Sequence, residues 1–226
     1  MPLRGSAAVA MWWDIAREHR AEFEDWHSHE HFPERLAIPG FIRGSRWADA
    51  SGGDGFFVLY ELEAHATLTS PHYLARLNDP SPWSTRMMPH HRDMVRSLCH
   101  VEASAGGGVA CVMATLRLSP QAETAQDLGK WLHAQLSALA RLPGVTGAHL
   151  LRTEIPQHAT TREQAIRGGA DAAADWIVLV NGYDAAAIAG AVGGQLSAAT
   201  LADHGAAPGS LASIYELRYT ATRGDL

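Results

Sequence analysis

Residues 36–41, Leu-Ala-Ile-Pro-Gly-Phe, return in similar form as residues 139–145, Leu-Ala-Arg-Leu-Pro-Gly-Val. In both stretches a proline ends a helical pattern, because it lacks the N–H that the helix needs, and a glycine supplies the turn into a run of strand-forming residues. The following strands correspond as well, since Phe-Phe-Val-Leu-Tyr at 56–60 matches Trp-Ile-Val-Leu-Val at 176–180. The chain is therefore predicted to repeat one structural unit twice.

Alternating hydrophobic residues predict eight strands, and longer periodic runs predict four helices between them. The strands are expected at residues 7–15, 41–49, 55–63, 94–103, 109–118, 145–154, 175–182 and 211–221, and the helices at residues 20–37, 66–77, 124–142 and 184–203. Each half of the chain then has the order β-α-β-β-α-β, which is that of a ferredoxin-like unit.

Such a unit has two helices on one face of its sheet and leaves the other face uncovered, while the predicted strands carry large apolar side chains on both faces. We therefore predict an α+β fold in which two tandem ferredoxin-like repeats pack sheet to sheet as an α/β barrel. The first repeat spans residues 1–104 and the second residues 109–226, joined near the flexible stretch 106–108. An insert at residues 155–174 is expected at the edge.

The composition is that of an ordinary globular protein, with 226 residues, 46% of them hydrophobic, and a formal net charge of −6. No Lys/Arg cluster is longer than two residues, which argues against nucleic acid and membrane surfaces as partners. Cys99 and Cys111 are too few for a disulfide scaffold, and the apolar run 7–15 is shorter than a membrane span. We expect a soluble, cytoplasmic protein whose partner is a small-molecule substrate, and a homodimer is left open.

Residues 26–35, Trp-His-Ser-His-Glu-His-Phe-Pro-Glu-Arg, hold three histidines, two carboxylates and an arginine. On one helix over 20–37, a step of about 100° per residue places His27 and Glu30 on one face with His31 at its margin. A neutral imidazole can act as a general base. We predict that His31 is the catalytic base, with His27 beside it, and that Glu30 orients it. Such a carboxylate would raise the pKa of His31.

Other interpretations of this segment stay open. The histidines could be hydrogen-bonded residues of a solvated helix end. His27 and His31 also have the spacing of two metal ligands on one helical face, but no second Cys/His pair completes a site, so no metal and no cofactor is predicted. Pro33 is expected to kink the helix and turn His31 toward the sheet, although a helix that restarts with proline in its first turn fits equally well.

Two strand residues are predicted to line a cavity with His31. Tyr60 would donate a hydrogen bond to a developing oxyanion, and Arg46 would pair with a substrate carboxylate or an enolate oxygen. Both could instead be structural, as a core tyrosine with a satisfied hydroxyl and a surface ion pair. The aromatic residues predicted to bind the apolar part of a substrate are Trp26, Trp47, Tyr73 and Trp83.

The polar segment resembles the dimeric α/β-barrel superfamily, in particular its EthD-like branch. The resemblance rests on residues 22–26, residues 30–36, Pro39-Gly40-Phe41 and Arg46-Trp47. It covers most of the chain as two tandem repeats, but the second has Trp131, Gln135 and Ala138 where the first has His27, His31 and Glu34. The resemblance implies one site per chain. The superfamily includes cofactor-free oxygenases, isomerases, polyketide cyclases and haem enzymes, so it does not fix the reaction.

These observations predict a cofactor-independent enzyme that acts on a small apolar carbonyl or phenolic compound. Proton transfer to a histidine base would be the difficult step, as in a lyase, isomerase or cyclase. A cofactor-free or haem-dependent oxygenase of the same fold is the first alternative, since a substrate carbanion that reacts with oxygen needs the same base. A non-catalytic protein that binds small molecules is the second. The sequence has no phosphate-binding glycine loop and no nucleophile elbow.

Overall fold

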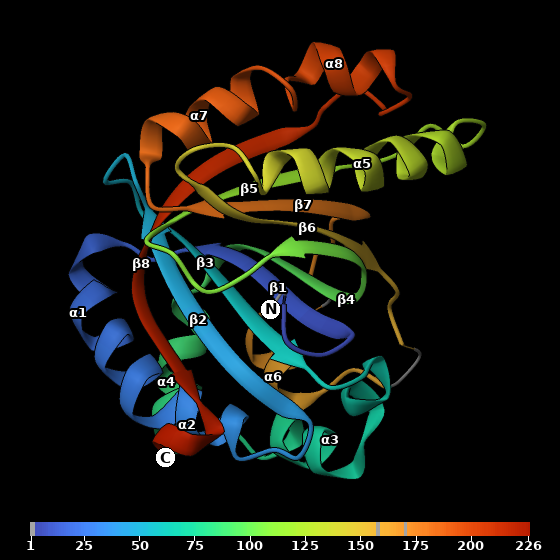
Figure 1. Ribbon diagram of the computed structural model, residues 1–226. Helices are drawn as coiled ribbons and strands as arrows, with labels where there is room; N and C mark the ends of the chain where they lie inside the picture. Colours follow the sequence, from blue (N-terminus) through green and yellow to red (C-terminus); the bar gives the residue numbers. More distant parts are fainter. Residues whose placement is uncertain (1–2, 157–158, 170) are drawn as a thin grey trace. The chain divides into compact units, whose positions relative to one another are not determined.

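The computed structural model describes residues 3–156, 159–169 and 171–226 (Figure 1). The chain forms two compact units. The first unit comprises Arg4–His100, Glu154–Ala173 and Arg218–Leu226, and the second comprises Met1–Leu3, Val101–Thr153 and Ala174–Leu217. The insert expected at residues 155–174 therefore falls almost entirely in the first unit, whose middle segment is Glu154–Ala173.

The first unit holds the elements that position the polar segment. In chain order they are β1 (Ala7–Asp14), α1 (Arg17–Trp26), the π-helical turn η1 (His27–His31), α2 (Phe32–Leu36), β2 (Phe41–Asp49), β3 (Gly55–Leu62), η2 (His65–Thr69), α3 (Pro71–Asn78), α4 (Pro82–Met87), η3 (Met88–His90), the first part of β4 (Arg92–Gly106), α6 (Arg162–Ile166), the last part of β8 (Leu211–Thr222) and η4 (Arg223–Asp225). Its strands pair antiparallel in the order β4-β1-β3-β2.

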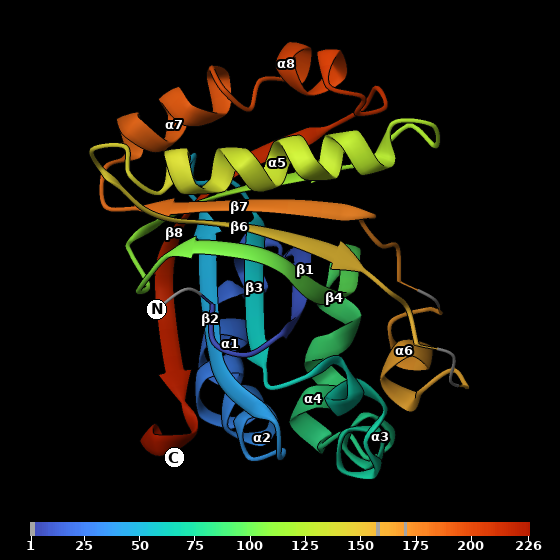
Figure 2. The same cartoon turned by 45° about the vertical axis from the view of Figure 1, so that its right-hand side comes forward.

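The second unit holds β5 (Val112–Leu118), α5 (Ala125–Leu139), β6 (Val145–Thr153), β7 (Trp176–Gly182), α7 (Ala185–Gly193) and α8 (Ala198–Asp203), with the remaining parts of β4 and β8. Its strands pair antiparallel in the order β6-β7-β5-β8. Figures 1 and 2 show α5, α7 and α8 on one face of this sheet. A core of leucine, valine and isoleucine side chains from the helices and strands fills the space between them.

The eight strands follow the closed hydrogen-bonded order β1-β3-β2-β8-β5-β7-β6-β4, an antiparallel barrel. The predicted α+β class is confirmed, because helices and antiparallel strands alternate in both units. The tandem origin of the halves and their sheet-to-sheet packing stay predictions. None of the helices in the described part of the chain is long and apolar enough to cross a membrane.

In the first unit, alternate strand residues face the helices. On β1 these include Val9 and Met11, and on β3 their ladder partners Tyr60 and Val58. They form one buried cluster with side chains of α1, α2, α3 and α4. Since a strand turns successive side chains to opposite faces, the register fixes which residues can reach the polar segment. Tyr60 is on that face, as predicted.

The single helix predicted over residues 20–37 is three pieces. The N–H of Phe32 bonds to the carbonyl of His27, five residues earlier, so the backbone widens into one π-helical turn. This widening is caused by Pro33, the residue after Phe32, because proline has no N–H to donate and its ring crowds the carbonyl of the preceding turn. Such turns recur at functional sites. Both His27 and His31 are buried as a result of this local path.

Gly44 on β2 tests the packing of this region. A Cβ atom there would overlap the ring of Phe32 and lie 2.8 Å from Cε1 of Tyr60. Gly44→Ala is expected to lower the free energy of unfolding by about 1–3 kcal/mol, the usual cost of overpacking. The matched control is Gly190 in α7, where a Cβ atom meets nothing within 4 Å. Gly190→Ala should stabilise by about 0.5–1 kcal/mol in the same denaturant titration. Equal stability of the two variants would contradict this packing.

Candidate active site

His31 lies at a small, partly open cavity whose lining residues all belong to the first unit. Its volume is about 30 Å³, which accommodates about two water molecules. The residues that line it are Val9, Met11, His31, Arg35, Phe41, Tyr60, Tyr73, Leu77, Arg96 and Glu163. The cavity therefore combines an apolar wall from β1, β2 and α3 with polar groups from η1, α2, β3, β4 and α6.

The rings of His27 and His31 stack, with 5.3 Å between their centroids and 25° between their planes. Both side chains are buried, and the Nδ1 atom of each has no hydrogen-bond partner among the described residues. Burial lowers the pKa of His31 well below its usual value, and the positive charge of Arg35 lowers it further. Burial and the positive charge of Arg46 likewise lower the pKa of His27 well below its usual value. Both imidazoles are therefore neutral at neutral pH.

This finding corrects the expectation that a carboxylate raises the pKa of His31. The Oε1 atom of Glu30 accepts hydrogen bonds from Trp26 Nε1 at 3.1 Å, from Ser84 Oγ at 3.4 Å, and from Ser81 Oγ. Glu30 therefore fastens α4 to the π-helical turn, and it does not line the cavity. Its predicted role as the residue that orients His31 was wrong, because its oxygen is directed at these donors.

Tyr60 is the second polar group at the cavity. Its side chain is buried, and its hydroxyl has no partner among the described residues. Burial raises the pKa of the phenol, so the group stays protonated at neutral pH. A buried hydroxyl that donates to nothing loses the hydrogen bonds that it makes to water in the unfolded chain. Tyr60 thus presents an O–H that could donate a hydrogen bond to an oxygen atom of a bound ligand. Its role as an oxyanion donor stays a prediction.

Arg35 and Glu163 form an ion pair at the cavity, from Nη2 to Oε1, and both side chains are about 5% exposed. Nη1 of Arg35 has no partner within the described part of the chain. Arg96 also lines the cavity and donates through Nη2 to the hydroxyl of Tyr73. Two guanidinium groups against one carboxylate give the lining a net positive charge, which favours a bound anion.

Arg46 faces the helices but does not line the cavity. Its Nη1 donates to the carbonyl of Glu24 at 3.2 Å and its Nη2 to Ser28 Oγ at 3.1 Å. The guanidinium also lies 5.7 Å from the ring centroid of Phe23 and 5.8 Å from that of Tyr219. Two of its donors thus hold the end of α1, whereas its Nε atom has no partner among the described residues. The pairing of Arg46 with a substrate stays a prediction.

Of the four aromatic residues predicted to bind substrate, only Tyr73 lines the cavity. Trp26 packs in the core, with its ring centroid 4.6 Å from that of His31. Trp47 is the ladder partner of Phe57, on the strand face opposite Tyr60, and stacks on it at 5.4 Å. Trp83 donates through Nε1 to Glu22 at 3.2 Å. These three tryptophans are packing residues in this structure.

Sequence reasoning missed three polar lining residues, namely Arg35, Arg96 and Glu163. Arg35 was within reach, because it follows His31 by four residues on the same helical face. Glu163 was not, since it comes from an insert some 130 positions away; only the capping box of Thr161 and Gln164 signals the short helix that carries it. The exposed His29 pairs with Asp25 and lies away from the cavity.

The cavity holds about two water molecules, so haem, like any aromatic ligand, would need its walls to move apart. A second and larger cavity of about 280 Å³ lies in the second unit. It is lined by Glu102, Ala125, Gln126, Gly129, His133, Leu150, Arg152 and Trp176. In the described part of the chain, none of its buried side-chain N or O atoms lacks a partner. The smaller cavity therefore has the stronger chemical signature, although the larger one has more room.

Neither a protein family nor a curated protein matches the chain by sequence. Solved structures do match its fold. An "anthrone oxidase-like protein" has a TM-score of 0.67 at 8% identity, over 99% of this chain and 96% of that one. A "Putative monooxygenase" from Fusobacterium nucleatum subsp. nucleatum has 0.63 at 6% identity, over 97% and 96%. Another with the same description, from Lactobacillus acidophilus, has 0.58 at 11% identity, over 97% of both chains.

These similarities show a shared fold. The three similar proteins are described as two putative monooxygenases and one anthrone oxidase-like protein, and their likeness to this chain is one of fold alone. Membership of the EthD-like branch stays a prediction. So do the cytoplasmic location, the small-molecule partner and the domain boundaries at residues 1–104 and 109–226.

Removal of the unpartnered hydroxyl of Tyr60 should not destabilise the protein. Tyr60→Phe is expected to leave the free energy of unfolding unchanged or to raise it by about 1 kcal/mol, because a buried group without a partner disappears. Tyr73→Phe is the matched control, since its hydroxyl accepts from Arg96. That variant should lose about 1.5 kcal/mol. A larger loss for Tyr60→Phe in denaturant titrations would show that its hydroxyl has a structural partner.

The buried histidines should make stability depend on pH. Burial lowers the pKa of His31 and of His91, the latter to about 4, from the ordinary 6.5. As the pH falls below 6.5 the unfolded chain takes up protons that the folded chain refuses, so each such histidine costs up to about 1.4 kcal/mol per pH unit until its folded-state pKa is reached. Unfolding measured between pH 7.5 and 5 should show this slope, and His31→Gln should reduce it. An unchanged slope in the variant would contradict a neutral, buried His31.

Proposed function

We propose that the protein is a cofactor-independent oxygenase for a small aromatic compound that carries an acidic C–H beside a carbonyl or phenol. The observation that supports this most is one cavity lined by a neutral imidazole, an unpartnered hydroxyl and an arginine with a free N–H, from His31, Tyr60 and Arg35. Buried polar groups normally have partners. Three such groups around one cavity are explained by a ligand that supplies their hydrogen bonds.

The proposed reaction begins when His31 accepts a proton from the substrate. The negative charge that develops on the substrate oxygen is stabilised by the hydroxyl of Tyr60 and by the guanidinium groups of Arg35 and Arg96. The depressed pKa of His31 disfavours an imidazolium in the free site. In the complex the substrate anion supplies an opposite charge beside it, which raises the basicity of the imidazole when the proton moves.

The substrate carbanion then reacts with molecular oxygen. For a methylene group that becomes a carbonyl, one oxygen atom enters the product and the other leaves with the two hydrogens as water, so no external reductant is consumed. The names of the proteins that share the fold support this choice over the lyase, isomerase or cyclase that the sequence put first. A lyase, isomerase or cyclase would use the same base, and turnover in the absence of oxygen would favour one of these reactions over oxygenation.

An aromatic substrate needs more room than the free cavity offers. The walls that can yield are α3, with Tyr73 and Leu77, and α6, with Glu163. These two helices are joined by a hydrogen bond from the N–H of Arg162 to Oδ1 of Asn78 at 3.0 Å. We therefore propose that substrate entry separates the insert from α3. A protein that only binds small molecules would require the same opening.

Oxygen uptake tests the proposal. Purified protein would be assayed with phenolic and aryl ketone compounds, including anthrone, and each active compound would be repeated with His31→Ala. Loss of the general base should reduce the rate about a hundredfold or more. His133→Ala, in the second unit, is the control, and its rate should stay close to that of the wild type. Equal losses in both variants would exclude His31 as the base, and binding without turnover on any compound would favour the non-catalytic function.

The pH dependence gives an independent check. Because only neutral imidazole accepts a proton, the rate of the chemical step should be flat between about pH 6.5 and 8 and should fall at lower pH, where His31 becomes protonated. Tyr60→Phe should lower the rate about a hundredfold, as for a lost oxyanion donor, without moving this profile. A rate that rises steadily from pH 6.5 to 8 would assign the proton transfer to another group.

A further inference from the structure

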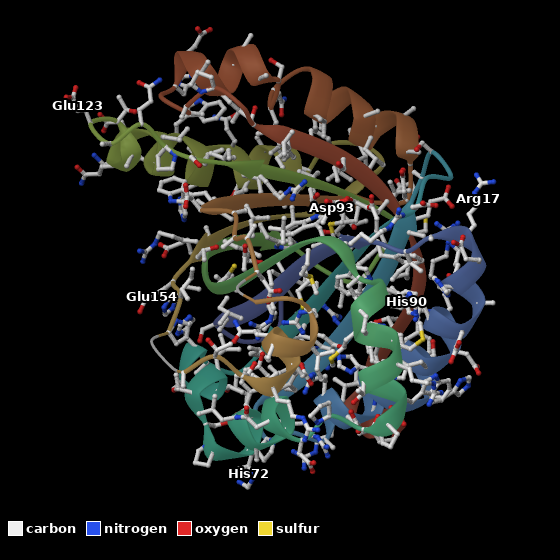
Figure 3. All side chains as sticks on the ribbon, turned by 180° about the vertical axis from the view of Figure 1, so that it is seen from behind. Arg17, His72, His90, Asp93, Glu123 and Glu154 are labelled. Carbon is white, nitrogen blue, oxygen red and sulfur yellow. The ribbon has the colours of Figure 1, made fainter. Side chains whose placement is uncertain are left out.

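A second polar cluster lies where the insert leaves the strand β6. His65 is the first residue of η2, His100 lies on β4, and Glu154 immediately follows β6. All three belong to the first unit. They are outside the cavity of His31, and each is at least partly exposed. Figure 3, where Glu154 is labelled, shows this part of the chain at the edge of the molecule.

The three side chains already share contacts. The rings of His65 and His100 stack with 4.2 Å between their centroids and 13° between their planes. Nε2 of His100 lies 3.2 Å from Oε2 of Glu154, and Nε2 of His65 lies 2.9 Å from the carbonyl oxygen of Glu154. One potential donor atom from each of the three side chains lies within 4.8 Å of the others.

We propose that His65, His100 and Glu154 bind a divalent transition-metal ion of the zinc class. Two imidazoles and one carboxylate are a common donor set for a four-coordinate zinc ion, whose remaining position is taken by water. With bonds of about 2.0–2.1 Å, tetrahedral ligands lie about 3.3 Å apart. The side chains would have to close by about 1–1.5 Å, and their exposure leaves their χ angles free to do so. Hard ions such as Mg²⁺ and Ca²⁺ prefer oxygen ligands and are not expected here.

The proposed ion would fasten the insert to the sheet. Glu154 lies between β6 and the insert and directly precedes it, whereas His65 and His100 belong to the framework of the first unit. The other end of the insert is already bonded to the sheet, because the N–H of Arg96 on β4 donates to the carbonyl of Ala172 at 2.7 Å. The insert carries Glu163 to its ion pair with Arg35. A metal at Glu154 would therefore restrict the segment that closes one side of the cavity.

Metal binding to the full chain tests this proposal. Metal-free protein would be titrated with Zn²⁺ by calorimetry, and with Co²⁺ to obtain the visible spectrum of a tetrahedral or five-coordinate site. We expect one ion per chain with a micromolar or lower Kd. At a hundredfold excess over Kd, Zn²⁺ should raise the Tm by about 5–10 °C. His65→Ala, His100→Ala and Glu154→Gln should each weaken binding at least tenfold while the Tm without metal stays within about 2 °C of the wild type.

The matched control is another pair of adjacent histidines, His19 and His90, whose ring centroids lie 3.7 Å apart with 31° between the ring planes. His90→Ala should bind Zn²⁺ as the wild type does, because no carboxylate completes a ligand set there in the described part of the chain. The proposal is overturned if His90→Ala abolishes binding, if the three cluster variants keep the wild-type Kd, or if the wild type binds only at millimolar Zn²⁺.

Discussion

The missing N–H of Pro33 is the constraint on which the candidate site depends. It leaves the carbonyl of the preceding turn without its helical donor, and the backbone responds with the π-helical turn that begins at His27. That turn buries both His27 and His31 in an aromatic layer between the helices and the sheet. A regular α-helix would follow another path past this point, so a single proline determines how an unusual pair of polar side chains enters the core.

Burial and charge then set the chemistry of the cavity. A buried imidazole next to Arg35 stays neutral, so His31 can accept a proton over the whole neutral range. The same arginine, held by Glu163, favours an anion in the position that such a proton transfer would create. Tyr60 adds a donor whose own ionisation is suppressed by burial. Arg35 and Tyr60 would therefore stabilise the substrate anion that proton transfer creates, and that anion would in turn stabilise the imidazolium of His31.

The strands and the longer helices could be predicted from the sequence because they follow from local patterns, whereas the short helices α4 and α6 were missed. The turns after Pro39 and Pro143, the alternation on β1 and β3, and hence the inward position of Tyr60 all depend on neighbouring residues. The sequence did not predict interactions at a distance. Glu30 accepts a hydrogen bond from Ser81 at the start of α4, and Arg46 donates to Glu24 and Ser28. Glu163 reaches the cavity from the insert. No periodicity in the chain encodes which of several equally polar partners a side chain meets.

Proton exchange without oxygen tests the central claim most directly, because it isolates the step assigned to His31. A compound that the protein oxidises in air would be incubated with it anaerobically in D₂O, and deuterium entering the acidic C–H position would be followed by NMR. The account predicts that the wild type accelerates this exchange well beyond the rate in buffer and that His31→Ala does not. Turnover in air by the wild type without any accelerated exchange, or undiminished exchange in His31→Ala, would contradict it.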